Sequence, residues 1–149
     1  MNATLTTLAL YAVFAALLCV LLLAIDLASG IARVRSRTTL NPEDAATILK
    51  SSELVPTEPE SVARALRAHR NALANIVPFL VAMFLWVLLG APRPWVFWLS
   101  AIFTGARVAH AVAYIASAQP WRSTAFAIGF TCQVITFAQL LRTALPLCS

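Results

Sequence analysis

Residues 64–80 read RALRAHRNALANIVPFL and join a cationic cluster to the start of a long apolar run. Three arginines, a histidine and an asparagine fall within eight residues, and charge is then absent for 22 positions. At about 100° per residue, Arg64, Arg67 and Asn71 share one helical face and Arg70 lies beside it. A helix here would carry its cationic end directly into a segment of lipid-crossing length. The rest of the chain must therefore explain why cations gather at a membrane boundary.

The composition is that of a membrane protein. Hydrophobic residues make up 60% of the 149 residues and charged residues 11%, whereas a soluble domain is about 25% charged. A soluble core of this size cannot hide so much apolar surface, and the length is that of one domain. We therefore expect a single, all-α integral membrane domain over residues 1–149.

The net charge of +5 does not indicate a nucleic-acid-binding protein. The basic residues lie between apolar spans, as is typical of cytoplasmic loops. The three cysteines (Cys19, Cys132 and Cys148) are widely spaced, there is no CxxC, and only two histidines are present. We expect no disulfide framework, no metal site and no nucleic-acid partner.

Four apolar runs predict four transmembrane helices. The expected spans are about 5–32, 71–91, 94–117 and 121–142, with a long loop over about 33–63. A cleaved signal peptide is the alternative for the first run, but that run lacks a basic start and is too long.

Two helix-start signatures lie in the long loop. Thr57-Glu58-Pro59-Glu60 resembles a capping box and extends the second helix back to about residue 58. Asn41-Pro42-Glu43-Asp44 predicts a short helix within the loop. Asp44 fits the third position of that helix, so a capping role and a catalytic role both remain open for it.

The distribution of basic residues predicts the orientation. The segment from Ile31 to Arg70 holds seven of the eleven Lys and Arg residues. The positive-inside rule places this segment in the cytoplasm and both chain termini on the other side.

This topology gathers polar groups from all four helices at the cytoplasmic side. They are Arg33, then Arg64, Arg67, Arg70 and Asn71, then Arg107, His110 and Tyr114, then Arg122 and Ser123. Arg107, His110 and Tyr114 follow steps of three and four and share one face. Because an arginine within a span is costly unless it faces protein or water, the clusters predict an anion-binding pocket. The dipole of the fourth helix adds partial positive charge to it.

Other interpretations stay open for several charged residues. Arg33, Arg35 and Arg37 can equally contact lipid headgroups at the membrane surface. Asp26, inside the first span, is a functional candidate by default, and Arg33 lies two turns further along the same face.

Four motifs in order resemble the MAPEG superfamily, the membrane-associated proteins in eicosanoid and glutathione metabolism. They are NPEDA (41–45), RALRAHRN with IVPFL (64–80), GARVAHAVAY (105–114) and PWRS (120–123). The resemblance covers roughly residues 33–130. It implies a homotrimer of four-helix subunits, with glutathione bound between neighbouring subunits near the cytoplasmic side and a lipophilic substrate that arrives from the bilayer.

The resemblance also implies roles for individual residues. Those that would bind glutathione are Arg33, Arg70, Asn71, His110 and Tyr114, supported by Arg67 and Arg107. Those that would act on the sulfur are Arg122 and Ser123, with Asp44 as a partner of the arginine. Forked guanidinium groups suit the two carboxylates of glutathione, and a nearby cation lowers the pKa of a thiol.

The chain departs from the family pattern at three positions. Ala63 and Ala74 stand where acidic residues flank the arginine cluster, and the acid expected at 74 helps to bind glutathione. Phe126 stands where prostaglandin-forming members have a tyrosine near the ligand. These departures bear on the affinity for glutathione and on substrate specificity.

The expected function is therefore a glutathione-dependent transferase, peroxidase or isomerase of the membrane. One alternative is a non-catalytic glutathione- or lipid-binding protein of the same fold. Another is a small transporter or channel subunit that would use Asp26 and the arginines as an ion path.

Overall fold

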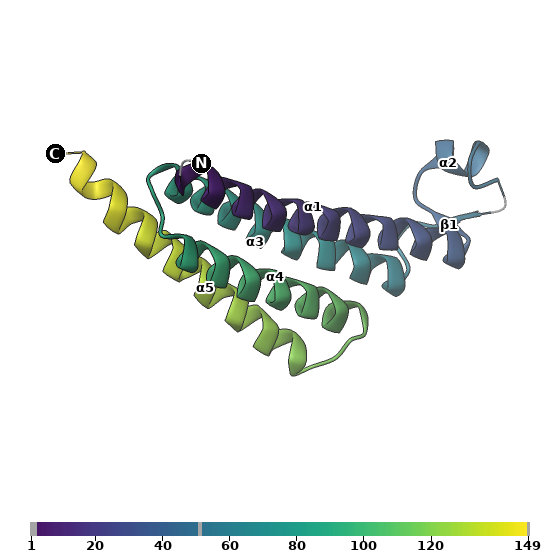
Figure 1. The fold of residues 1–149 in the computed structure, drawn as a ribbon. Helices are drawn as coiled ribbons and strands as arrows, with labels where there is room; N and C mark the ends of the chain where they lie inside the picture. Colours follow the sequence, from purple (N-terminus) through teal and green to yellow (C-terminus); the bar gives the residue numbers. More distant parts are fainter. Residues whose placement is uncertain (1–2, 51, 149) are drawn as a thin grey trace.

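The computed structural model describes residues 3–50 and 52–148, most of which lie in four long helices (Figure 1). These are α1 (Ala3–Ser36), α3 (Glu60–Leu88), α4 (Arg93–Ile115) and α5 (Trp121–Ala144), followed by a 3-10 turn, η1 (Leu145–Leu147). All four helices are long and apolar enough to cross a membrane. The expected all-α, four-helix membrane fold is thus confirmed. The α1 helix continues past its expected span and carries Arg33 and Arg35 in its last turn.

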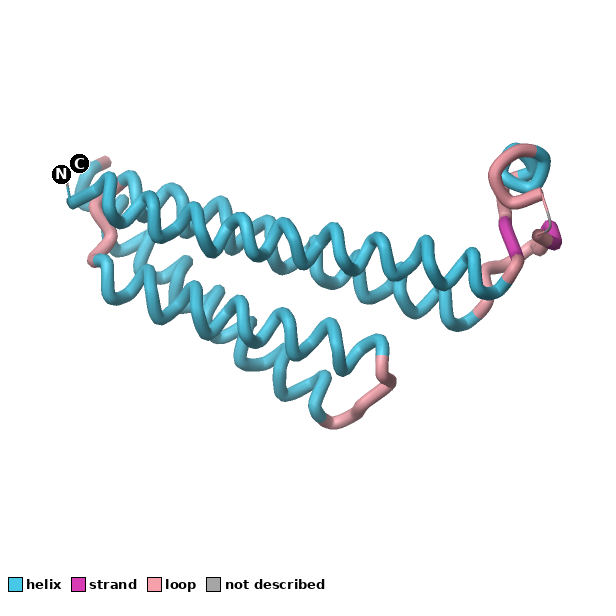
Figure 2. Tube along the Cα trace, turned by 45° about the vertical axis from the view of Figure 1, so that its right-hand side comes forward, coloured by secondary structure: helices cyan, strands magenta, loops and turns pink. Residues whose placement is uncertain are grey.

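Two antiparallel helix pairs build the bundle. The α1 helix packs along α3, and α4 packs along α5. Between the pairs, Phe79 and Phe103 stack with their ring centroids 3.8 Å apart. Near the chain termini, the Trp86 indole donates a hydrogen bond of 3.1 Å to the Thr143 hydroxyl and ties α3 to α5. At the opposite end the pairs diverge, and α1 and α3 extend beyond α4 and α5 (Figures 1 and 2).

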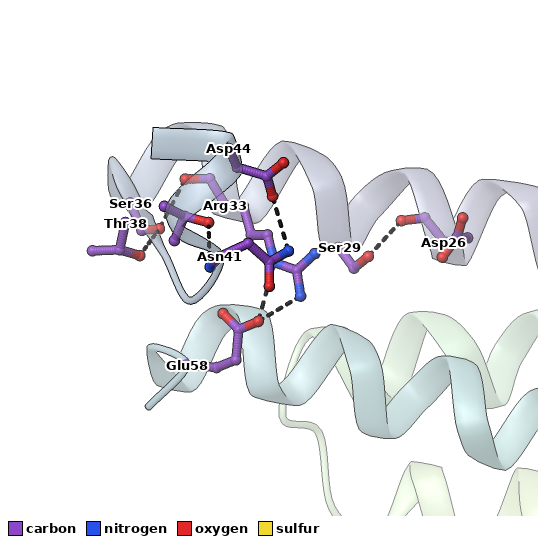
Figure 3. Close-up of polar contacts among 9 residues, drawn as sticks. Asp26, Ser29, Arg33, Ser36, Thr38, Asn41, Asp44 and Glu58 are labelled. Atoms are coloured by element: carbon purple, nitrogen blue, oxygen red, sulfur yellow. Dashed lines mark hydrogen bonds and ion pairs between the residues drawn. The ribbon is translucent and has the colours of Figure 1, made fainter. Parts of the chain in front are cut away.

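Two side-chain contacts set the register between α1 and the α3 segment. The Tyr11 hydroxyl donates to the Leu80 carbonyl oxygen at 3.1 Å. Some 20 residues further along α1, Nε and Nη2 of Arg33 both donate to Oε1 of Glu58, with the Nε bond 3.1 Å long (Figure 3). This Arg33–Glu58 ion pair joins the end of α1 to the residues just before α3, across the long loop.

The capping box expected over residues 57–60 is wrong. Glu60, the acid expected at the third helical position, is the first residue of the helix, and its carboxylate accepts from Arg64 and Arg67, because a guanidinium is a stronger partner for a carboxylate than a backbone N–H. Glu58 lies outside the helix, and its carboxylate pairs with Arg33. The α3 helix begins at Glu60 with Pro59 as its N-cap, and no side chain caps it.

The loop between α1 and α3 is folded. It contains β1 (Thr38–Thr39), α2 (Pro42–Ala46) and β2 (Glu53–Leu54), and the two strands pair in parallel. The α2 helix begins after Asn41, as expected, and Nδ2 of Asn41 donates to Oδ2 of Asp44 at 3.0 Å. The strand pair was not anticipated, because strands of two residues carry no periodic signal.

Candidate active site

A polar cleft of about 250 Å³ opens to the surface between α3, α4 and α5. Its lining residues are Asn71, His110, Tyr114, Arg122, Ser123 and Phe126. The first five are site residues that the sequence predicted, and they come from three different helices. The structure therefore brings together the side chains that the helix spacing and the topology place at one end of the bundle.

Helix geometry explains how these residues meet. The α4 helix ends at Ile115 and α5 begins at Trp121, so the last turns of one lie beside the first turns of the other. His110 and Tyr114 share a face of α4 because they are four residues apart. Pro120 is the N-cap residue of α5, which places Arg122 and Ser123 in its first turn.

A buried arginine lies behind the cleft and contacts two of its lining residues. The Arg107 side chain is 1% exposed, and its Nη2 lies 2.9 Å from Oδ1 of Asn71 and 2.9 Å from Nδ1 of His110. Nε and Nη1 of Arg107 are buried without a hydrogen-bond partner. In the described part of the chain no carboxylate forms an ion pair with it. Its positive charge is therefore uncompensated next to the cleft.

The Arg107 contacts determine which atoms of Asn71 and His110 can donate. Arginine only donates hydrogen bonds, so Nδ1 of His110 accepts and the ring proton lies on Nε2. Oδ1 of Asn71 accepts as well, which leaves its amide NH₂ as the free donor. Arg107 thus turns two side chains that can donate or accept into hydrogen-bond donors.

The outer part of the cleft combines a cation with aromatic rings. The Arg122 guanidinium lies over the Tyr114 ring, with Cζ 4.8 Å from the ring centroid. The His110 ring centroid is 5.6 Å from that of Tyr114 and 6.0 Å from that of Phe126. The Ser123 hydroxyl donates to Oε1 of Gln119 at 3.1 Å. A ligand here would meet a positive charge, a hydroxyl and flat apolar surfaces.

Other predicted residues lie around the cleft or away from it. Arg67 donates to Oε1 of Glu60 at 2.7 Å and also interacts with Tyr114, which places it at the margin of the cleft. Arg70 precedes Asn71 and is exposed on α3. Arg33 lies on α1, a helix that does not contact α5, and it is paired with Glu58.

The structure does not bring Asp44 to Arg122 within one chain. Asp44 belongs to α2, which has no contact with α5, and its carboxylate accepts from Asn41 (Figure 3). The physical reason is that α1 and α3 extend beyond α5 and the loop packs near their ends (Figure 1). This contact joins two side chains and caps no backbone N–H, so both roles left open for Asp44 stay predictions.

Sequence reasoning missed Gly129 of α5. A Cβ atom at this position would lie 3.5 Å from Cδ and 3.7 Å from Nη1 of Arg107. These are ordinary contact distances, so the α5 backbone passes directly beside the buried Arg107 side chain at this position. Nothing in the sequence marks this glycine, since the contact depends on how α4 and α5 are turned toward each other.

The chemistry of the cleft favours an anionic ligand. Its lining side chains include a guanidinium, an amide, an imidazole, a phenol and a hydroxyl, and no carboxylate. Among the described residues, no group of three or more His, Cys, Asp and Glu side chains could hold a metal ion. The donor set fits the carboxylates and thiol of glutathione, the ligand that the motifs imply.

His110 offers a direct test of the donor assignment. In His110→Gln, the amide oxygen can accept from Arg107 and the amide nitrogen can donate into the cleft, so we expect glutathione affinity within about threefold of wild type. His110→Phe keeps a ring of similar size but removes both functions, and we expect affinity to fall about tenfold or more. Calorimetric titration of the two variants provides the comparison. Equal affinities would contradict a donor role for His110.

Comparison with known proteins shows the family to which the chain belongs. The model of the MAPEG family matches residues 8–142. Microsomal glutathione S-transferase 1 of Mus musculus is 37% identical over 124 residues, covering 80% of this chain and 79% of the relative. Prostaglandin E synthase of Homo sapiens is 36% identical over 116 residues, covering 75% and 73%. With a match across nearly all of its described helices, the chain belongs to the MAPEG family.

Proposed function

We propose that the protein is a glutathione-dependent membrane enzyme that stabilises a thiolate for attack on a lipophilic electrophile, peroxide or endoperoxide. The observation that carries this proposal is the position of Arg122 and Ser123 in the first turn of α5, within a cleft of hydrogen-bond donors. Relatives named for glutathione transfer and for prostaglandin E synthesis support the use of glutathione.

Arg122 and Ser123 act on the sulfur in this proposal. A free thiol of this kind has a pKa of about 8.5, so little thiolate exists at pH 7. A guanidinium and the amino end of a helix both stabilise the anion and lower that pKa. The Ser123 hydroxyl adds a further donor once it turns away from Gln119. Bound glutathione supplies the nucleophile, and the protein supplies its charge stabilisation.

The remaining cleft residues bind the rest of the tripeptide. The amide of Asn71, Nε2 of His110 and the Tyr114 hydroxyl donate to its backbone and carboxylates, while Arg67 and Arg70 add charge at the margin. Arg107 holds Asn71 and His110 in their donor orientation. Arg33 and Asp44 would reach this site from a neighbouring subunit, and the proposal therefore includes the homotrimer that the family resemblance implies.

The proposed setting is a membrane with the cleft near its cytoplasmic side. Seven of the eleven basic residues lie between Ile31 and Arg70, which places both chain termini on the opposite side. The lipophilic substrate then arrives laterally from the bilayer, in contact with the apolar outer faces of the helices. This arrangement brings a water-soluble thiol and a lipid-soluble electrophile to one boundary.

Purified protein in detergent micelles tests the proposal. We expect glutathione to raise the melting temperature in proportion to RT ln(1 + [L]/Kd), and to show thiolate absorbance at pH 7. We also expect turnover with at least one hydrophobic aryl halide, lipid hydroperoxide or lipid endoperoxide. S-methylglutathione is the matched control, since it binds but cannot ionise. Binding without turnover would favour a non-catalytic binding protein, and absence of binding would refute the proposal.

A further inference from the structure

The polar cleft lacks a partner for one part of glutathione. Besides two carboxylates and a thiol, the tripeptide carries an ammonium group on its glutamyl end. No carboxylate lines the cleft, and Ala74, one turn beyond Asn71 on α3, is an exposed residue with no polar side chain. The cleft therefore offers this ammonium group only the hydroxyl oxygens of Tyr114 and Ser123 as side-chain acceptors at its aromatic end, and no negative charge.

Asp26 is a carboxylate without a partner. Of the six acidic residues, the other five lie between residues 43 and 60, so Asp26 is the only one on α1. It is exposed on α1, and its side chain makes no hydrogen bond or ion pair with a residue that the structure describes. The Ser29 hydroxyl donates to the backbone carbonyl oxygen of Asp26, at 2.7 Å, and not to the Asp26 side chain (Figure 3). Because an unpaired carboxylate on the outer surface of a membrane-spanning helix is unfavourable, a cationic partner outside its own chain would stabilise Asp26.

Asp26 lies at the same depth in the bundle as the cleft. Counting along α1 and α3 from their two side-chain contacts places Asp26 level with Ala65. Consistently, Ala28 and Ala65 line one hollow between α1 and α3. Counting along the antiparallel helices α3 and α4 from the contact between Asn71 and Arg107 places Ala65 at nearly the same depth as Tyr114. The unpartnered carboxylate and the acid-free cleft therefore face outward from one chain at one level.

We infer that Asp26 of one subunit completes the cleft of a neighbouring copy of this chain by binding the ammonium group of glutathione. The inference rests on the proposed function and assigns an acceptor that the cleft itself lacks. Arg33 supports it, because seven residues return nearly to the same side of a helix. When a second copy packs this side of its α1 against the cleft, it presents the Asp26 carboxylate to the cleft. The same copy presents the Arg33 guanidinium two turns nearer the cytoplasm.

A ligand lacking the ammonium group provides the decisive test. Glutaryl-cysteinyl-glycine is glutathione without its amino group. We expect Asp26→Asn to weaken glutathione binding roughly tenfold or more and to leave binding of this analogue unchanged. Glu53→Gln, an acid-to-amide change at an exposed residue of the loop, is the matched control and should alter neither affinity.

The outcomes separate this inference from the proposed function. Equal weakening of both ligands would show that Asp26 holds the subunits together, and unchanged glutathione binding would show that it has no role; either result overturns the inference. If the wild-type protein binds neither ligand, the proposed function fails first.

Co-expression tests whether Asp26 acts on another subunit. In mixed oligomers of Asp26→Asn and Arg122→Ala chains, some sites combine an intact cleft with an intact Asp26 from its neighbour. Random mixing makes about a quarter of the sites complete, and at low glutathione we expect about that share of wild-type activity. If Asp26 acts within its own chain, the mixture will show no more than about half the activity of Asp26→Asn alone, and that result overturns the inference.

Discussion

Arg122→Ala is expected to lower the rate of glutathione conjugation about 100- to 1,000-fold at pH 7, the loss typical of removing one group that stabilises a developing or bound anion. Arg122 belongs to the first turn of α5, and its guanidinium lies over the ring of Tyr114 from α4. It is the cation nearest the proposed position of the sulfur. Without it the thiol keeps a pKa near 8.5 and little thiolate forms. Because other side chains bind the carboxylates, glutathione affinity should fall much less than the rate. Single-turnover kinetics and thiolate absorbance measure the two effects separately.

The direction of the pH dependence strengthens this test. A cation lowers the thiol pKa, so the wild-type rate should already be near its plateau at pH 7, whereas the variant should gain rate up to about pH 9. Arg142→Ala is the matched control, since Arg142 lies exposed near the other end of α5. A variant with full activity and an unchanged pH profile would remove Arg122 from the catalytic assignment.

Arg107→Met is expected to separate stability from function. Methionine fills much of the same volume without placing an uncompensated charge in the bundle, so we expect the melting temperature to stay the same or rise. Glutathione affinity should nevertheless fall about 100-fold, because Asn71 and His110 both lose the donor that orients them. Thermal unfolding and calorimetric titration on the same preparation give both numbers.

Arg93→Met serves as the control for this variant. Arg93 begins the same helix and is exposed, so the same substitution there should change neither stability nor affinity. If Arg107→Met binds glutathione as wild type does, Arg107 has no positioning role. If it fails to fold, the guanidinium is a structural requirement and the separation expected here is wrong.

Helical periodicity and topology made much of the cleft predictable. His110 and Tyr114 share a face because of their spacing, and antiparallel packing necessarily brings the end of α4 to the start of α5. The α3 residue Asn71 then lies at the same end of the bundle. These relations depend only on regular helices joined by short connections, which the apolar runs signal strongly.

Contacts made by irregular segments could not be predicted in the same way. Residues 57–60 match a capping box, yet α3 begins only at Glu60, whose carboxylate pairs with Arg64 and Arg67. Glu58 pairs with Arg33 once α1 and α3 are aligned. The position of Asp44 depends on how the loop folds over the helix ends, and a two-residue strand pair contributes to that fold. Such competition between local and distant partners is decided by three-dimensional packing.

The buried arginine also constrains how the chain enters its membrane. An arginine near the middle of a helix costs about 2.5–3.5 kcal/mol during insertion, and α4 is the least apolar of the four spans. In the folded protein this guanidinium is held by Asn71 of α3 and packed against Gly129 of α5. We therefore expect the α4 helix to enter the bilayer together with a neighbouring helix rather than alone. The side chain that orients two ligand-binding residues is thus also the one that makes insertion of α4 costly, and substitutions at its contacts are expected to reduce the yield of inserted protein.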